Sequence, residues 1–462
     1  MKVIHPLRKL GRWTGAGLLS LTLLLGYVTP MQAEASQNAG PDISPWSIET
    51  LNDGEKYGIY PLDWYYEGTF RQAITSEKFN SLMDATEAKL DLLGLEKKAD
   101  SLSFETDEVI TREAVITSLY KLLTNYDLPE SFDITVASPI EHMQQIGVVK
   151  GTNAGLELEQ PSTTEQAVVM ASRMVEFTYD LTDGGADGLL WKVTNDENTM
   201  YLLGSIHLGI TDMYPLDKDI RTAFDESDEL WVEANILTGD MNYLVEKMVY
   251  NDGSTIKDHV SAETYEMLNK VLVKLGMPEG TLDGYKPFAA SNTLSTFSYF
   301  EDPADSVMAS ATSIDSHFIA SAIVQDKPVN ELEGIKMQAD LLSDVPADQQ
   351  EKELNDVLDM LLSEDGAKES AEQLEQMQLL WVDGDLEAFK EFVGDMDQGT
   401  SGEVYDRLLG ERDKNMAKKL AELLEREGEH TFFIVVGAAH YVTDGMVVDL
   451  LKEQGYDVQF VE

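Results

Sequence analysis

The sequence predicts an α/β fold, with a mixed, largely parallel sheet covered by helices, and an N-terminal all-α repeat domain before it. From residue 189 onward, short apolar runs alternate with long helical stretches, and before residue 180 one spacing of residues recurs three times. A length of 462 residues also favours more than one domain. The expected organisation is a signal peptide at 1–35, helical repeats at 36–180, a linker at 181–188 and the α/β domain at 189–462.

The first 35 residues have the order of a secretory signal peptide. Cationic residues precede an apolar run from Ala16 to Val28, and small residues around Ala33 and Ala35 follow it. The run is shorter than the ~20 residues that a membrane-spanning helix needs. We therefore expect a secreted or cell-surface protein with no transmembrane span after signal removal. An uncleaved anchor is the alternative.

Composition excludes several classes of function. The formal net charge is −50 with no visible basic stripe, which argues against a nucleic-acid partner. There is no cysteine, so disulfides, thiolate nucleophiles, iron–sulfur clusters and Cys-ligated zinc are excluded. Any metal must be held by carboxylates and by some of only seven histidines.

The N-terminal region contains a repeated spacing. In each unit a Gly and an apolar residue are followed, 15 residues after the apolar one, by a hexamer with Thr and Glu near its start. We expect each Gly to end a helix in the left-handed conformation, and a Thr to cap the next helix with a Glu in its first turn. One unit cannot bury its apolar face alone, so the three should pack together. The Gly residues are Gly58, Gly94 and Gly147, and the hexamers are Ile74–Phe79, Ile110–Val115 and Thr163–Val168.

These units resemble the S-layer homology domain, which usually has three of them. The matching pieces are Trp46–Ile48 with Gly58, Ile110–Val115, and Gly147–Gly151 before Thr163–Val168. The family binds secondary cell-wall polysaccharide, so the resemblance implies a glycan site lined by Arg112 and Glu113. Ser76 stands where the family has Arg in unit one, and Glu165 does so in unit three. A helical spacer with degenerate repeats is therefore the alternative.

The α/β region begins with a predicted hairpin, in which strands 190–193 and 199–203 flank the turn-rich residues 195–198. Further strands are expected at 229–233, after a short helix, and at 328–332, 431–436 and 458–461. Residues 239–300 and 337–427 are expected to be mostly helical. This alternation predicts a largely parallel sheet under helical cover.

Three predicted strands lead into chemically active residues. Two segments of the form Gly-x-x-His follow strands and end at His207 and His440, and Glu233 ends the strand between them. Ligands bind beyond the carboxyl ends of strands in parallel sheets. We expect Gly204 and Gly437 to let the chain turn sharply there. Two imidazoles and a carboxylate form a plausible three-ligand metal site with a position open for water; hydrogen-bonded structural histidines are the alternative.

Residues 189–462 resemble the TraB/GumN family, whose metalloprotease relatives include the Tiki proteins. The resemblance implies a metal-type site made by the two Gly-x-x-His histidines and the Glu after the second strand, and it points to Arg412 as a site residue. Ser205 replaces the usual Thr and Ser313 the usual Gly, and neither change removes a candidate ligand. The pieces that carry the resemblance are Leu190–Val193, Tyr201–His207, Leu230–Glu233, Ser313–Asp315, Lys327–Glu333 with Gln338, Trp381–Asp385, Arg412 with Asn415-Met416, Val436–His440 and Gly455-Tyr456.

The other candidate residues have functional or structural interpretations. Arg412 is expected to stabilise an oxyanion or to orient Glu233, or else to form a surface salt bridge. Glu333 is a candidate ligand, general base or hydrogen-bond partner of a His. Asp315 is expected to cap a helix. The remaining histidines, His142, His259, His317 and His430, are expected to be structural or exposed.

The resulting hypothesis is an exported metal-dependent hydrolase, a peptidase, tethered to or near the cell wall. His207, Glu233 and His440 would hold a divalent ion (zinc, manganese, iron or cobalt), with Glu233, Glu333 and Arg412 as catalytic residues. Its partners would be a peptide or protein substrate and cell-wall polysaccharide. The alternative is a non-catalytic cell-surface protein that binds and sequesters a peptide signal.

Overall fold

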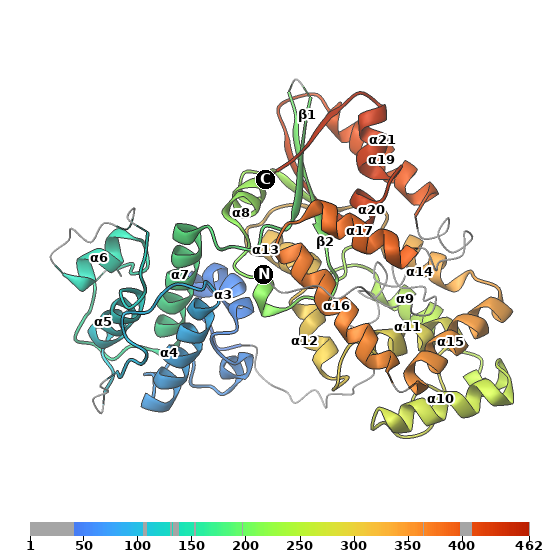
Figure 1. Ribbon diagram of the computed structural model, residues 1–462, viewed down its shortest axis with the longest axis horizontal. Helices are drawn as coiled ribbons and strands as arrows, with labels where there is room; N and C mark the ends of the chain where they lie inside the picture. Colours follow the sequence, from blue (N-terminus) through green and yellow to red (C-terminus); the bar gives the residue numbers. More distant parts are fainter. Residues whose placement is uncertain are drawn as a thin grey trace.

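The computed structural model describes residues 41–461 except 105–108, 130–131, 133–137, 152–153, 196, 364 and 398–408. The predicted signal peptide at 1–35 lies outside the described residues. The helical N-terminal region lies on the left of Figure 1, and the sheet with its covering helices lies on the right.

The N-terminal region is all-α in its described residues. Its α-helices are α3 (Ile48–Gly54), α4 (Ser76–Asp91), α5 (Arg112–Leu123), α6 (Pro139–Gln145) and α7 (Thr164–Thr182). Short 3₁₀ turns are η1 (Pro45–Ser47), η2 (Glu55–Tyr57) and η3 (Leu62–Tyr66). The long helix α7 packs against α3, α4 and α5, so it forms the centre of this region.

The local geometry predicted for the repeats is confirmed. Gly58, Gly94 and Gly147 have φ angles of 72°, 66° and 79°, in the left-handed region where a side chain is strained. Thr75, Thr111 and Thr163 are the N-caps of α4, α5 and α7, and each hydroxyl accepts a hydrogen bond from the backbone N–H three residues on.

The segments before the three capped helices also meet in space. The backbone N–H of Ile74 donates to the carbonyl of Ser162 at 2.8 Å, and the N–H of Ser162 donates to the carbonyl of Ile110 at 2.9 Å. Three hexamers that are far apart in the chain thus join side by side, as expected of units that cannot bury their apolar faces alone. The resemblance of these units to the S-layer homology domain stays a prediction.

The second region contains a six-stranded sheet in the order β4-β3-β5-β2-β1-β6. The four strands β4, β3, β5 and β2 run parallel to one another, while β1 is antiparallel to both of its neighbours, β2 and β6. The predicted mixed, largely parallel sheet is therefore confirmed. The strands are β1 (Leu189–Thr194), β2 (Thr199–Ser205), β3 (Glu229–Val232), β4 (Val329–Glu331), β5 (Thr431–Gly437) and β6 (Asp457–Phe460).

Helices cover this sheet, and a second group of helices extends beside it at the lower right of Figure 1. Helix α13 contacts strands β3, β4 and β5, while α9 packs on α14, and α10 and α11 pack on α15. The helical elements are η4 (Thr211–Met213), α8 (Lys218–Asp225), α9 (Met241–Met248), η5 (Ile256–Asp258), α10 (Ala262–Lys274), α11 (Pro287–Phe297), α12 (Asp305–Ala311), α13 (Ile314–Val324), α14 (Ile335–Ser343), α15 (Ala347–Leu362), α16 (Gly366–Val382), α17 (Leu386–Asp397), α19 (Glu411–Leu424), α20 (Ala439–Val442) and α21 (Val447–Glu453).

Strand β5 lies in the middle of the sheet, and its apolar sequence accounts for this position. Its run Phe432–Val436 is fully buried, as a parallel strand covered on both faces requires. Beside it, the end of β2 is fixed by α16, because the indole N–H of Trp381 donates to the carbonyl of Gly204 at 2.7 Å. The Trp381 side chain is itself fully buried.

The two regions contact each other directly. The amide of Asn52 on α3 donates to the hydroxyl of Ser321 on α13 at 2.8 Å, and the ammonium of Lys89 donates to the carbonyl of Thr211 at 2.8 Å. Helix α7 ends at Thr182, and the chain then forms a parallel bridge between Ala186 and Leu216. The residues of the predicted linker are thus part of the contact between the regions.

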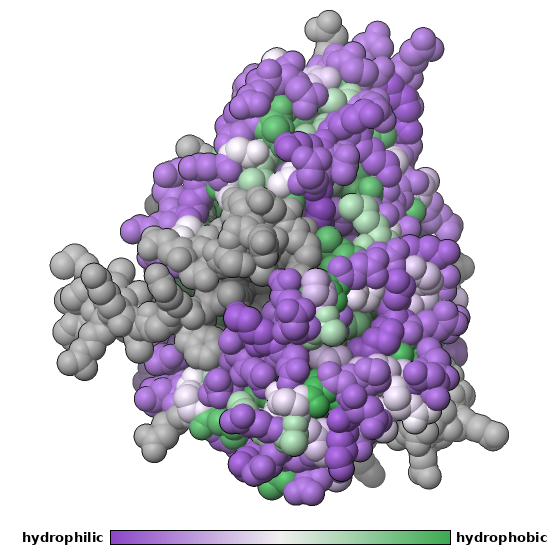
Figure 2. Space-filling view, turned by 90° about the vertical axis from the view of Figure 1, so that its right-hand side faces the viewer, coloured by the Kyte–Doolittle hydropathy of each residue, from purple (hydrophilic) through white to green (hydrophobic). Residues whose placement is uncertain are grey.

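The surface agrees with the acidic composition. Figure 2 shows that the face at the right of Figure 1 is mainly hydrophilic, with apolar side chains scattered between polar ones. Within the described residues, no single helix has both the length and the apolar composition of a membrane span, although the bent pair α12 and α13 meets those two criteria together.

Candidate functional site

Three neighbouring parallel strands end at the same edge of the sheet. The last residue pair between β2 and β5 is Ser205 with Gly437, and β3 pairs with β5 up to Val232 with Val435. His207 follows β2, Glu233 follows β3, and His440 lies on the short helix α20 that follows β5. The sheet topology therefore brings these three residues to one edge from distant parts of the chain.

Their side chains converge around Gly437. A Cβ atom built on Gly437 would lie 3.2 Å from Oε1 of Glu233, 3.6 Å from Nε2 of His207 and 3.8 Å from Cδ2 of His440. Nε2 of His440 is 3.9 Å from Oε1 of Glu233. All three residues are at most 5% exposed. Gly437 also donates its backbone N–H to Oε1 of Glu233 at 2.7 Å, which fixes the carboxylate at this point.

The glycines of the two Gly-x-x-His segments do not adopt the left-handed conformation. Neither Gly204 nor Gly437 has a positive φ angle; Gly204 lies within β2, and the chain passes from β5, which ends at Gly437, into α20 at Ala439. At both positions glycine fits because a side chain would come too close to neighbouring atoms. A Cβ on Gly204 would lie 3.1 Å from Cβ of Ala438, and one on Gly437 would enter the centre of the site.

Each imidazole is held by a buried carboxylate. Nδ1 of His207 lies 2.9 Å from Oδ2 of Asp315, and Nδ1 of His440 lies 3.0 Å from Oδ1 of Asp413. Ser205 donates its hydroxyl to the other oxygen of Asp315 at 3.0 Å. Because a carboxylate accepts, each Nδ1 carries the proton and each Nε2 keeps its lone pair. Metal-ligating histidines commonly have this arrangement.

A buried guanidinium completes the site. Arg412, on α19, donates its Nε and Nη2 to the two oxygens of Glu333, both at 2.8 Å, and Nη2 also donates to Oε2 of Glu233 at 3.0 Å. The amide of Gln338 donates to Glu233 at 3.1 Å and to Glu333 at 3.2 Å. The guanidinium and the amide therefore link the two carboxylates into one network.

The charges in this network stabilise each other. Burial by itself raises the pKa of Glu333, but the hydrogen bonds and charge of Arg412 outweigh it and lower the pKa below its usual value. Burial by itself lowers the pKa of Arg412, and the carboxylate of Glu333 raises it overall. Glu333 is therefore an ionised partner of Arg412, and both of its oxygens already accept hydrogen bonds.

Some residues of this site were missed or misread from the sequence. Asp315 does not cap a helix, because Ser313 is the N-cap of α13 and Asp315 binds His207 instead. The sequence patterns predict no role for Asp413, although it directly follows Arg412 in the sequence. Gln338 enters only as part of the family resemblance. For Asp413, the available signal was its position next to Arg412, which the family resemblance already marks as a site residue.

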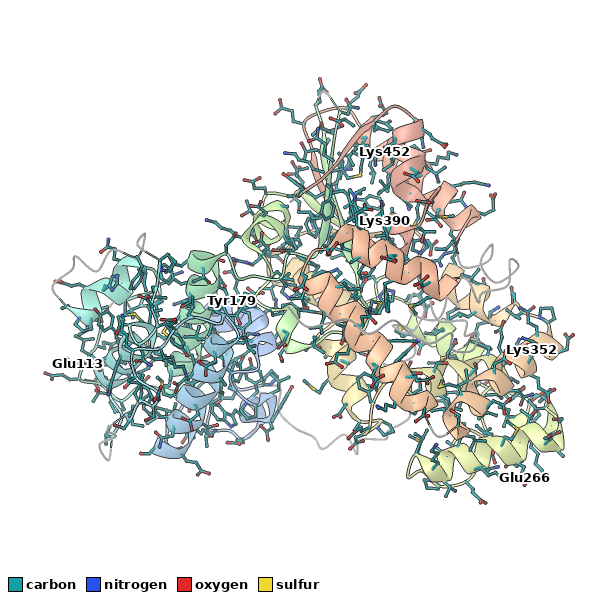
Figure 3. All side chains as sticks on the ribbon, in the orientation of Figure 1. Glu113, Tyr179, Glu266, Lys352, Lys390 and Lys452 are labelled. Carbon is teal, nitrogen blue, oxygen red and sulfur yellow. The ribbon has the colours of Figure 1, made fainter. Side chains whose placement is uncertain are left out.

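Two other candidate residues lie elsewhere. Arg112 on α5 is buried, and its Nε donates to the carbonyl of Leu156 at 2.9 Å. Glu113 is exposed and projects outward from the helical region, on the side away from the sheet (Figure 3). Their role in glycan binding stays a prediction, and the structure gives Arg112 a contact that holds the loop after α6.

His142, His259, His317 and His430 are not part of the sheet-edge site. His142 packs on Phe132, and His259 stacks on Tyr250. Nε2 of His430 lies within hydrogen-bond distance of the carbonyl of Glu427. His317 on α13 lies at the contact between the two regions, where it packs edge-on against Tyr214 at 5.2 Å between ring centroids.

The site has donor atoms that suit a divalent ion, although they are not arranged ready to hold one. Among the described residues, no group of three or more His, Asp or Glu side chains is arranged ready to hold a metal. The donor types nevertheless fit, because two Nε2 lone pairs and one carboxylate suit several divalent ions. The 3.9 Å between His440 and Glu233 is within the ~4 Å that two ligands about 2.1 Å from a shared ion can span.

One orphaned atom supports this fit. Nε2 of His440 is fully buried and has no hydrogen-bond partner among the described residues. A buried acceptor without a partner costs free energy, so such an atom is rare unless something binds it. Beside the site, a cavity of about 40 Å³ is lined by His207, Gly437 and apolar side chains that include Met377, Phe389 and Val393.

A family profile covers this second region. Residues 189–459, more than half of the chain, match the profile of the family described as TraB/PrgY/gumN. The chain is 35% identical over 57 residues to "Metalloprotease TIKI homolog" of Nematostella vectensis, which covers 12% of each chain. It is 41% identical over 51 residues to "Metalloprotease TIKI1" of Xenopus tropicalis, covering 11% of this chain and 10% of that one.

A third relative, "Metalloprotease TIKI homolog" of Amphimedon queenslandica, is 32% identical over 75 residues, covering 16% of this chain and 12% of that protein. The matched segments thus span about a tenth of the length of these relatives, between 10% and 12%. No solved structure matches the chain significantly.

Proposed function

Because this chain belongs to the TraB/PrgY/gumN family, we propose that it is a metal-dependent hydrolase that cleaves peptide bonds. One observation carries the proposal: two imidazoles, each with Nδ1 bound to a buried carboxylate, converge with Glu233 around Gly437. The names of the similar proteins, which are called metalloproteases, support the same reaction class.

In this proposal His207 and His440 hold a divalent ion through Nε2, together with Oε1 of Glu233. Zinc, manganese, iron and cobalt all suit such a donor set. A bound ion of this kind lowers the pKa of water and polarises a carbonyl group.

The protein's own residues prepare that chemistry. Asp315 and Asp413 fix the orientation and tautomer of the two imidazoles. Oε1 of Glu233 is the carboxylate atom nearest the centre, and it is placed either to hold the ion or to accept a proton from an attacking water. Gly437 leaves the space in which these atoms meet.

Arg412 acts mainly by orienting Glu233. Its guanidinium already binds Glu233 on one oxygen and Glu333 on both, which favours this role over direct stabilisation of an oxyanion. Glu333 serves as the partner of Arg412 rather than as a general base, because its two oxygens are both occupied. We therefore treat Arg412 and Glu333 as positioning residues.

We further propose that the substrate is a peptide or an unfolded protein segment. The three central residues are at most 5% exposed, so a folded surface does not reach them without movement of the covering chain. The apolar cavity beside His207 is suited to a small apolar side chain next to the cleaved bond.

Location is a separate proposal. The N-terminal sequence pattern supports export to the cell surface, and the helical repeats would hold the enzyme near the cell wall. Co-sedimentation of the mature chain with purified walls tests the second part. Failure to co-sediment would reduce the repeat region to a spacer beside the α/β domain.

A non-catalytic role is the second candidate. It is favoured by one observation, that Oε2 of Glu233 is bound to the guanidinium of Arg412. In this alternative the same site binds a peptide signal and keeps it from its receptor. Peptide binding that survives a chelator, without any cleavage, would support it.

The test is cleavage of a peptide mixture by the purified mature protein, with the products identified by mass spectrometry. The double variant His207→Ala/His440→Ala should lose all cleavage, and so should wild type treated with a chelator. His259→Ala, an exposed histidine outside the site, is the matched control and should retain full activity. Equal cleavage by wild type and double variant would refute the proposed site.

A further inference from the structure

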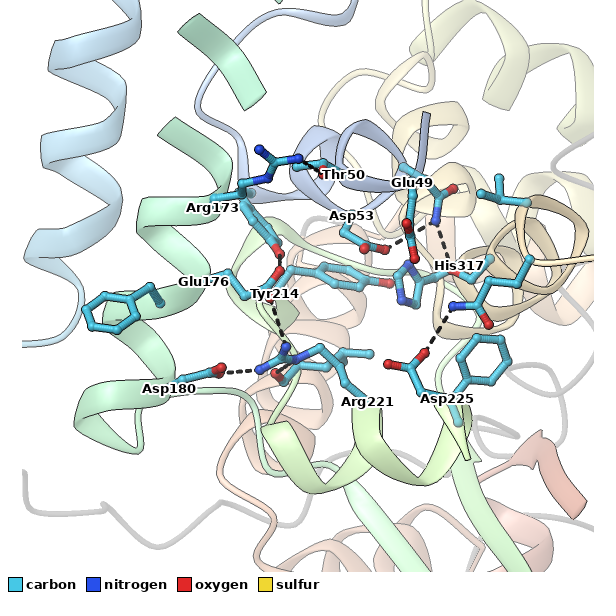
Figure 4. A pocket seen from close by; sticks show the side chains of 18 of the residues that line it. Glu49, Thr50, Asp53, Arg173, Glu176, Asp180, Tyr214, Arg221, Asp225 and His317 are labelled. Carbon is cyan, nitrogen blue, oxygen red and sulfur yellow. Dashed lines mark hydrogen bonds and ion pairs between the residues drawn. The ribbon is translucent and has the colours of Figure 1, made fainter. Parts of the chain in front are cut away.

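A large cavity lies where the helical region meets the α/β domain. Its volume is about 440 Å³, within the roughly 300–1,000 Å³ typical of small-molecule sites. Side chains from α3, α7, α8 and α13 surround it, as Figure 4 shows. It lies apart from the sheet-edge site, and none of its lining residues belongs to the proposed metal chemistry.

Two charged residues that line this cavity are partly buried and form no ion pair among the described residues. Arg221 forms ion pairs with Glu176, at 3.1 Å, and with Asp180. No ion pair among the described residues includes Asp53 or Arg173, although both line the cavity.

The few contacts of these two residues are neutral. Asp53 accepts one hydrogen bond from Asn52 at 3.3 Å, and Arg173 donates one to Thr50 at 3.3 Å. Burial raises the pKa of Asp53 to about 7, even though Lys56 lowers it in part. Burial also lowers the pKa of Arg173. One acid and one base of the same cavity are thus partly desolvated; opposite charges lie near them (Lys56 for Asp53, Glu176 and Glu49 for Arg173), but none forms an ion pair with them.

A third side chain points to a ligand independently. His317 is 5% exposed, lines the cavity, and its Nδ1 has no hydrogen-bond partner among the described residues. Burial, together with Lys56 and Arg221, lowers the pKa of His317 well below its usual value, so the ring is neutral. Buried polar atoms in proteins nearly always have a partner.

We propose that this cavity binds a small zwitterion, a free amino acid or a short peptide with unblocked ends, whose ammonium group meets Asp53 and whose carboxylate meets Arg173. The neutral ring of His317 then takes a further polar atom of the ligand. A simple cation would leave Arg173 without a direct ion-pair partner, and a simple anion would do the same to Asp53. A ligand with both charges gives each residue a direct partner.

This ligand would connect the two regions of the protein. Asp53 and Arg173 belong to α3 and α7 of the helical region, whereas His317 belongs to α13, which packs on the sheet. The inference does not depend on the proposed hydrolase activity, because it uses none of the sheet-edge residues.

Isothermal titration calorimetry with the full mature protein tests the proposal. The probes are the common L-amino acids and alanyl-alanine, compared with N-acetyl-alanyl-alanine, alanyl-alanine amide and propylamine. At least one unblocked probe should bind, and blocking either of its ends should weaken binding about 10- to 100-fold, as the loss of a charge-assisted hydrogen bond does.

Two variants assign each end of the ligand. In Asp53→Asn the unblocked and N-acetylated probes should bind equally weakly, and in Arg173→Gln the unblocked and amidated probes should do so. The matched control Asp212→Asn removes an exposed carboxylate of η4 that does not line the cavity, and it should bind as wild type does. The double variant His207→Ala/His440→Ala should also bind normally, which separates this site from the proposed hydrolase.

Three results would overturn the inference: no binding of any unblocked probe, equal binding of blocked and unblocked probes by wild type, or binding of propylamine as tight as that of alanyl-alanine. Thermal melting of each variant shows whether a lost signal reflects the cavity or an unfolded chain.

Discussion

The helical region and the sheet-edge site each contain a buried arginine near the start of a helix, and the two are used differently. Arg112 opens α5, donates to the backbone carbonyl of Leu156, and forms no ion pair among the described residues. Arg412 lies at the start of α19 and donates to Glu233 and Glu333. Burial lowers the pKa of Arg112, whereas Glu333 raises that of Arg412.

This difference teaches how to separate a structural arginine from a site arginine. Both residues are at most 5% exposed, so burial does not distinguish them. The hydrogen-bond partners distinguish them. An arginine that binds backbone carbonyls holds a loop in place, whereas an arginine that binds ionised carboxylates is part of a charged network.

The largest expected effect comes from breaking the network. Arg412→Met leaves Glu233 and Glu333 buried without their cation and should lower the free energy of unfolding by about 3–5 kcal/mol. Arg112→Met leaves only neutral carbonyls without a donor and should cost about 1–3 kcal/mol. Urea denaturation of both variants measures the difference. Equal losses would contradict the distinction between the two arginines.

The next effect concerns the space at Gly437. In Gly437→Ala the new methyl group lies 3.2 Å from Oε1 of Glu233 and pushes apart the atoms that converge there. We expect metal affinity to fall about 10- to 100-fold, with a stability loss of about 1–3 kcal/mol.

Gly394→Ala is the matched control, since a Cβ at that exposed position of α17 meets nothing within 4 Å. Metal affinity should not change, and the helix should gain up to about 1 kcal/mol. If Gly437→Ala bound metal as tightly as Gly394→Ala, the centre of the site would lie elsewhere.

A third prediction uses pH to compare two buried carboxylates. Asp53 has its pKa raised from 3.8 to about 7, so its contribution to stability is present at low pH and is lost as the pH rises through 7. Besides burial, Glu176 and Glu49 act in the same direction and Lys56 opposes them. Asp53→Asn should therefore gain stability relative to wild type as the pH rises from about 4 to 8.

Glu333 should behave in the opposite way. Its pKa is lowered, so its stabilising contribution is present above the ordinary glutamate value of about 4.3 and is lost below it. The stability deficit of Glu333→Gln should shrink as the pH falls. Denaturation curves from about pH 2 to 8 measure both variants, and slopes of the same sign would refute the assignment.

The smallest effect is expected at the helix caps of the repeats. Thr163→Ala removes a hydroxyl that accepts the N–H of Gln166 at 3.1 Å and should cost about 1 kcal/mol. Glu113→Gln, on the exposed surface of α5, should change stability by less than about 0.5 kcal/mol. A large loss for Glu113→Gln would show that this surface has a partner.

Much of the fold could be predicted because its signals are local. Apolar runs mark β2 and β5, Gly58 and Gly147 mark helix ends, and Thr163 marks a cap. The meeting of His207, Glu233 and His440 also follows from sequence, because the carboxyl ends of neighbouring parallel strands share an edge.

What the sequence did not predict depends on how helices dock over that edge. Asp315, Gln338 and Asp413 reach the site from α13, α14 and α19, and no spacing within the chain encodes those approaches. The cavity with Asp53 and Arg173 depends in the same way on the contact between the two regions.

Metal stoichiometry tests the central claim most directly. The mature protein, loaded separately with zinc, manganese, iron(II) and cobalt and then desalted, is measured by elemental mass spectrometry beside His207→Ala/His440→Ala and the control His259→Ala. We predict one tightly held ion per chain in wild type and control, and none in the double variant. Equal metal content in all three proteins, or none in wild type, would contradict a metal site at this edge of the sheet.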